Sequence, residues 1–271
     1  MSTDARVDMP RSRPARPAVA EAAEVDGLES ALKTLARSDL ASAPEDEIVA
    51  ALETMVTHAD FPCLGAKSVF RRGTVVHSVL DDMDDPSVTT TLLERLATFG
   101  SDVEGSPGFH SLMVTFRRPR HGSEAAFEAS LFRLLQRLHD ADSESWAKGV
   151  GSDPQDAHFA FSVAGTAYFI VGLHPLASRV ARRAPLATLV FNPHAQFEAL
   201  RAEGRFDGMR TTIRRRDEQL QGFVNPMVAD HGDSSEARQY SGRRLPPGWE
   251  PPLHVHLSDD EQHDPHERGE G

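Results

Sequence analysis

The stretch FAFSVAGTAYFIVGLHP, residues 159–175, decides the fold. Its two apolar runs meet at Ala164-Gly165, and glycine enters the positive-φ region of a tight turn without steric cost. We therefore expect two strands joined by a hairpin turn, the second running over residues 167–173 and ending at His174-Pro175. These paired strands predict a sheet within the fold.

Strands and helices are predicted on both sides of this hairpin. Apolar density predicts further strands in GFHSLMVTFRRP (108–119) and ATLVFNPH (187–194), each ended by a proline. Helical spacing or a capping residue predicts helices at 28–35, 45–58, 124–138 (with Ser123 as N-cap), 178–183, 194–204 and 206–220. The elements follow no regular βαβ order, so the sequence predicts an α+β fold, a mixed sheet flanked by helices.

The ends of the chain differ in composition from its middle. Residues 1–25 mix Pro, Arg and Ala without a period, and residues 259–271 hold six acidic residues against one arginine. Segments of this kind bury too little apolar surface to offset their ordering entropy. We expect a disordered leader at 1–25, one domain at 26–258 and a disordered acidic tail at 259–271.

Composition also restricts the class of protein. The 271 residues suffice for a large core without a disulfide or metal, and the only cysteine, Cys63, excludes an internal disulfide. No apolar run approaches the length of a membrane span, and the net charge of −12 argues against non-specific nucleic-acid binding. A cytoplasmic protein without membrane or nucleic-acid partners is predicted.

Two histidines follow predicted strands, where functional sites are commonly built. His174 ends the second hairpin strand and His194 ends the strand at 187–194, so both imidazoles could approach one cavity and bind iron, zinc or copper. The alternative is a histidine hydrogen-bonded to a backbone carbonyl. Arg179, Arg182 and Arg183 share one side of a helical turn and could hold a phosphate or a haem propionate, or form a solvated basic face.

Three further segments carry candidate functional groups. Cys63 lies in FPCLGAK (61–67) near Lys67, where an ammonium favours a thiolate, although a lone cysteine is usually a small buried hydrophobic residue. The consecutive arginines 214–216 are predicted to lie on the surface. SSEARQYSGR (234–243) is too polar for a core strand, and predicts a solvated loop or the polar wall of a pocket.

Five motifs in order resemble one known family. They are FPCLGAK (61–67), FSVAGTAYFIVGLHPLASRVARR (161–183), TLVFNPHAQFEALR (188–201), IRRRDEQLQGFVNPM (213–227) and SEARQYSGR (235–243). Together they are similar to the haem-dependent guanidine N-hydroxylases, which include the arginine hydroxylase of D-cycloserine biosynthesis and the hydroxylase of the guanitoxin pathway. The resemblance covers about residues 58–250.

The resemblance implies a b-type haem with an axial histidine, and oxygen insertion on a guanidino nitrogen. The axial ligand carries over to His174 or His194, with His194 favoured, and the thiolate of Cys63 is a minority alternative. Arg179 and Arg182 are expected at the haem propionates. Glu236 is the first candidate to pair with the substrate cation, and Glu198 the second.

The chain departs from these relatives in one place. Where they tend to end in tryptophan followed by Cys-Pro-Phe, this sequence has WEPPL (249–253), without a second cysteine.

The predicted function is therefore a cytoplasmic haem-dependent monooxygenase that N-hydroxylates L-arginine or a related guanidino compound, in natural-product or antibiotic biosynthesis. Its partners would be the guanidino substrate and dioxygen, or peroxide, with an electron donor. Two alternatives remain: a haem-binding or stress protein without catalysis, and an enzyme using a non-haem metal held by the same histidines. P-loop, dinucleotide-binding, HExxH and GxSxG motifs do not occur in the sequence.

Overall fold

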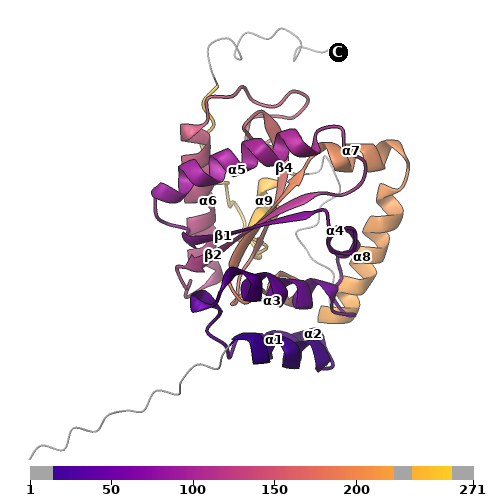
Figure 1. Ribbon diagram of the computed structural model, residues 1–271. Coiled ribbons are helices and arrows are strands. Elements are labelled where there is room, and N and C mark those ends of the chain that lie inside the picture. The colour runs from indigo at the N-terminus through magenta and orange to yellow at the C-terminus, as the bar shows by residue number, and fades with distance from the viewer. Residues whose placement is uncertain (1–14, 223–233, 258–271) are drawn as a thin grey trace, which may run out of the picture.

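A five-stranded mixed sheet forms the centre of the computed structural model, which describes residues 15–222 and 234–257 (Figure 1). The strands lie in the order β1-β2-β5-β4-β3, and β1 pairs with β2 in parallel while the other neighbours are antiparallel. Their bounds are β1 (Val75–Asp82), β2 (Ser111–Arg118), β3 (Phe161–Val163), β4 (Thr166–Leu173) and β5 (Ala187–Pro193). The predicted α+β class with a mixed sheet is confirmed.

Helices cover both faces of this sheet. Within the described ranges they are α1 (Ala15–Glu24), α2 (Leu28–Leu35), α3 (Glu45–Thr57), α4 (Leu64–Arg72), α5 (Ser87–Val103), α6 (Glu124–Ala141), α7 (Ala195–Ala202), α8 (Phe206–Gln221) and α9 (Ala237–Tyr240), with 3₁₀ turns at Leu40–Ser42 and Val180–Arg182. In Figure 1, α1, α2 and α3 lie together on one side, and α7 and α8 run along one edge of the molecule. None of these described helices is long and apolar enough to cross a membrane.

The predicted hairpin is present between β3 and β4. Its turn residues Ala164 and Gly165 have φ of 51° and 70°, and Val163 pairs with Thr166 across the turn. Both turn residues therefore adopt the left-handed conformation that suits the twist of two antiparallel strands. The predicted N-cap is also confirmed, because the Ser123 hydroxyl accepts a hydrogen bond from the Ala126 amide at 3.1 Å.

The sheet separates two hydrophobic cores. Side chains alternate between its faces, so Leu189 and Phe191 of β5 pack with α5 and α6, whereas Val190 between them packs toward the core formed with α1, α2 and α3. In β4 the same alternation places Ile170 in the first core and Leu173 in the second. This second face also carries the candidate site.

The prediction for the N-terminal leader is wrong from residue 15 onward. Residues 15–24 form α1, in which Ala18 and Ala22 are fully buried. Small alanines allow close helix packing, so this segment docks without large apolar side chains. The structure does not describe residues 1–14, which are the rest of the predicted leader. The predicted tail at 259–271 also lies outside the described residues.

Two elements of the fold, β1 and α5, are not predicted by the sequence. Together with β2 they form a crossover unit, in which α5 connects two parallel strands. β1 is an edge strand whose residues are mostly half-buried or exposed, so its apolar signal is weak. The helix predicted at 178–183 is reduced to the 3₁₀ turn Val180–Arg182.

Candidate functional site

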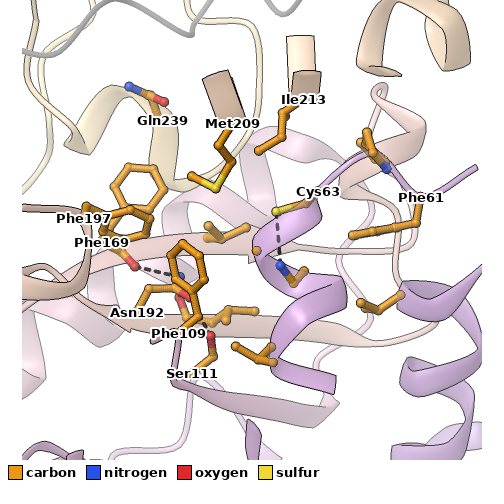
Figure 2. A pocket seen from close by; sticks show the side chains of 18 of the residues that line it. Phe61, Cys63, Phe109, Ser111, Phe169, Asn192, Phe197, Met209, Ile213 and Gln239 are labelled. Carbon is orange, nitrogen blue, oxygen red and sulfur yellow. Dashed lines mark hydrogen bonds between the residues drawn. The ribbon is translucent and has the colours of Figure 1, made fainter. Parts of the chain in front are cut away.

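A cavity of about 330 Å³ lies between the second face of the sheet and the helices α4 and α8 (Figure 2). Met113, Val171 and Val190 form its floor, one from each of β2, β4 and β5. A cavity of this size falls in the range of small-molecule sites. This cavity is therefore the candidate functional site of the protein.

Most of the cavity wall is apolar. Phe197 of α7 contacts Phe109 and Phe169, with ring centroids 6.0 Å and 5.8 Å apart. Met209 and Ile213 project from α8 toward the cavity on another side (Figure 2). These aromatic and thioether groups suit a flat, apolar ligand surface.

Cys63 lies on the cavity wall at the start of α4 (Figure 2). It is the N-cap residue of that helix, and its Sγ accepts a hydrogen bond from the Ala66 amide at 3.4 Å. Burial raises the pKa of the thiol, while the backbone amides of Ala66 and Gly65 and the charge of Arg182 act in the opposite direction. The sulfur is thus a soft donor presented to an apolar space.

The two arginines predicted as an anion site both line the cavity. Arg179 pairs with Asp217 of α8, and its Nε has no hydrogen-bond partner among the described residues. Arg182 donates to the carbonyls of Gly172 and Gln239, both at 3.1 Å, and burial lowers its pKa to about 9. Arg183 instead pairs with Glu29.

The predicted surface position of arginines 214–216 is only partly right. Arg215 is exposed, but Arg214 lines the cavity. Arg216 donates to the carbonyls of Ala59 and Phe61 and so fastens α8 to the segment before Cys63. The reason is that α8 packs across the cavity, which the sequence of the helix did not indicate.

Glu236 is on the polar side of the cavity, as the pocket-wall interpretation of 234–243 predicted. Ser234, Glu236 and Gln239 all line the space. The Glu236 side chain is 12% exposed, and its Oε1 lies 3.3 Å from Nε2 of His194. Its other oxygen, Oε2, is buried without a hydrogen-bond partner among the described residues.

Neither predicted ligand histidine is among the residues that line the cavity. His174 belongs to the opposite face of the sheet, where its ring stacks on Phe127 with centroids 4.5 Å apart. It is 1% exposed, its Nδ1 accepts a hydrogen bond from the Leu176 amide, and burial lowers its pKa to about 4. Pleat alternation explains the placement, since Leu173 before it faces the cavity.

His194 follows β5 and precedes α7, where its backbone amide donates to the Ala167 carbonyl at 2.8 Å. The structure thus does not bring the two imidazoles to one space. Across the described ranges 15–222 and 234–257, no group of three or more His, Cys, Asp or Glu side chains could hold a metal ion.

These features describe an α+β protein with a mixed sheet, a core on each face and a mainly apolar cavity that carries charged groups on its wall. The chain belongs to the YqcI/YcgG family, whose model matches residues 52–254. All residues that line the cavity lie inside this match. The match begins within α3, so α1 and α2 lie outside it.

Two relatives come from Bacillus subtilis (strain 168). One is described as "Uncharacterized protein YcgG" and is 28% identical over 198 residues, which cover 69% of this chain and 78% of the relative. The other, "Uncharacterized protein YqcI", is 25% identical over 189 residues, which cover 66% of this chain and 74% of that relative. No solved structure matches the chain.

Proposed function

We propose that this protein is a haem-dependent N-hydroxylase that acts on the guanidino group of L-arginine or a related compound in natural-product biosynthesis in the cytoplasm. The observation that carries the proposal is the composition of the cavity. One apolar space presents the sulfur of Cys63, the guanidinium of Arg179 and the carboxylate of Glu236. The motif resemblance of residues 58–250 supplies the reaction class.

The residues that line the cavity fit a haem. Its macrocycle needs apolar walls, which Phe109, Phe197 and Met209 provide. Its iron needs a protein ligand, and the Cys63 thiolate is of a type that binds haem iron. Its propionates need buried donors, and Arg179 Nε has no other partner among the described residues.

This fit favours Cys63 over the two histidines as the ligand. The thiol is on the cavity wall, whereas His174 lies on the opposite face of the sheet and His194 is engaged with Glu236. Bound there, the haem would supply the activation of dioxygen with two electrons from a separate donor, or of peroxide without a donor. Burial raises the pKa of the Cys63 thiol, and the amides of Ala66 and Gly65 and the charge of Arg182 oppose that shift. Coordination to the haem iron would supply the remaining stabilisation of the thiolate.

The protein's own contribution is to orient the substrate and exclude water. Glu236 would accept hydrogen bonds from the guanidinium through its unpartnered Oε2. A carboxylate and a guanidinium form strong, directional pairs, so the planar cation would be held in one orientation. The phenyl rings around it would exclude water from the reacting nitrogen.

An absorption spectrum of the purified full chain tests this proposal. A Soret band, followed by hydroxylated product from arginine in the presence of dioxygen and a reductant, is the expected result. A Soret band without turnover would instead indicate a non-catalytic haem-binding protein. Colourless protein that takes up no added haem would overturn the proposal.

The ligand assignment has its own test. Cys63→Ala should shift the Soret band or abolish it, because the variant lacks the sulfur on the cavity wall. His174→Ala and His194→Ala should keep the wild-type band position. A shift in either histidine variant, with Cys63→Ala unchanged, would return the assignment to that histidine.

A further inference from the structure

One imidazole holds the cavity carboxylate by a direct contact. Nε2 of His194 lies 3.3 Å from Oε1 of Glu236, and the two side chains are 10% and 12% exposed. The residues are far apart in sequence, His194 at the end of β5 and Glu236 just before α9. The contact therefore exists only because the sheet and α9 pack together.

His194 is held by contacts on the side away from Glu236. Its backbone amide donates to the Ala167 carbonyl, and its Nδ1 lies 3.8 Å from Oε1 of Glu198, one helical turn further along α7. Glu198 in turn pairs with Arg201. The ring thus lies between two carboxylates, one half exposed on α7 and one on the cavity wall.

This arrangement leaves the two oxygens of Glu236 in different states. Oε1 faces the imidazole, and Oε2 is buried without a partner in the described part of the chain. Each oxygen of an ionised carboxylate can accept hydrogen bonds, and a buried oxygen that accepts none is energetically unfavourable. A carboxylate fixed at one oxygen is ready to accept a cationic donor at the other.

We infer that His194 is a positioning residue, which fixes Glu236 by Oε1 so that Oε2 can accept an N–H of a guanidinium ligand in the cavity. The inference rests on the proposed function for its ligand class, but it assigns a role to His194 that differs from metal binding. A charge-assisted hydrogen bond in a fixed geometry loses less entropy on binding than one made by a free side chain. His194 should therefore affect cation recognition selectively.

Paired ligands and paired variants test this role. L-arginine and L-citrulline have similar shape, but citrulline lacks the positive charge. Their dissociation constants for the full-length protein, measured by isothermal titration calorimetry, give a preference ratio. The variants are His194→Phe, which removes the donor, and His194→Gln, which keeps an N–H. Glu236→Gln serves as the positive control, and His158→Phe, at an exposed histidine, as the negative control.

We expect the wild type to prefer arginine, and Glu236→Gln to lose that preference. His194→Phe should reduce the ratio by about tenfold, the scale of one charge-assisted hydrogen bond, while His194→Gln restores most of it. If His194 served only to pack the fold, both ligands would weaken equally and the ratio would stay constant. His194→Met, which adapts to irregular space, replaces the Phe variant if the latter does not fold.

An unchanged ratio in the donor-free variant would overturn the inference. So would a wild type that does not distinguish arginine from citrulline. The spectrum and turnover test of the proposed function separates the two failures, because an enzyme that hydroxylates arginine with an unchanged ratio in His194→Phe refutes only the positioning role.

Discussion

Arg179 and Asp217 form an ion pair with 2.9 Å between Nη2 and Oδ2, although their side chains are only 11% and 5% exposed. Arg179 follows β4, and Asp217 is the buried residue of α8. Gln221 donates to the second carboxylate oxygen of Asp217. The pair therefore ties α8 to the sheet beside the cavity.

Removing one partner should destabilise the fold strongly. Asp217→Asn leaves the buried Arg179 charge without its counter-ion, and such changes lower the free energy of unfolding by about 3–5 kcal/mol. Urea unfolding measures the loss. Arg118→Ala, which removes an exposed pair with Asp81, is the control and should lower stability by about 0–1 kcal/mol. Similar small effects for both variants would contradict the structural role of the Arg179–Asp217 pair.

Gly172 lies in β4 where the sheet meets α6 and α9. A Cβ at this position would come within 2.7 Å of the Tyr240 carbonyl oxygen and 2.8 Å of Phe127 Cε1. Gly172→Ala should therefore lower the melting temperature, because both neighbours are fixed in the core. Gly208→Ala in α8 is the matched control, since nothing lies within 4 Å of its Cβ. That change should stabilise the helix by about 0.5–1 kcal/mol. A melting temperature that falls for Gly208→Ala and not for Gly172→Ala would contradict the close packing around Gly172.

The stability of the fold should decrease as the pH falls below neutral. Burial lowers the pKa of His174 from 6.5 to about 4, so the unfolded chain binds the proton more readily than the folded one. The stabilisation by the neutral ring is present above pH 6.5 and is lost progressively toward pH 4. Burial lowers the pKa of His77 and His121 as well, so these histidines also make the fold less stable as the pH falls.

From pH 7 to pH 5 this one histidine should account for a loss of about 2 kcal/mol. His174→Phe should remove that part of the slope in urea unfolding measured at the two pH values, whereas His158→Phe at an exposed position serves as the control. A slope equal to that of the wild type in His174→Phe would show that another group governs the acid response.

The N-terminal helix should contribute measurably to stability. Deleting residues 1–25 removes α1, whose Ala18 and Ala22 are fully buried, and exposes the apolar surface of α2 and α3 beneath it. Deleting residues 1–14 leaves α1 in place. Differential scanning calorimetry should show a lower melting temperature for the first deletion than for the second. Equal melting temperatures would mean that α1 does not stabilise the domain.

Local sequence determined the parts of the fold with strong short-range signals. The Ala164-Gly165 turn, the apolar strands around it and the Ser123 cap each follow from a few adjacent residues, and all were predicted correctly. The composition of residues 234–243 allowed two interpretations, a solvated loop or the polar wall of a pocket, and three of these residues line the cavity. The edge strand β1 was missed because its half-buried residues carry little apolar pattern.

Only the tertiary structure decided which of the candidate groups share one space. His174 and Leu173 are adjacent in sequence, yet the pleat places them on opposite faces of the sheet, so Leu173 lines the cavity and His174 does not. Cys63 lines the cavity because α4, which it caps, packs over that face. The contact between His194 and Glu236 joins residues 42 positions apart. Sequence periodicity specifies which residues share a face of one element, but the packing of elements specifies which faces meet, and here that packing formed the site.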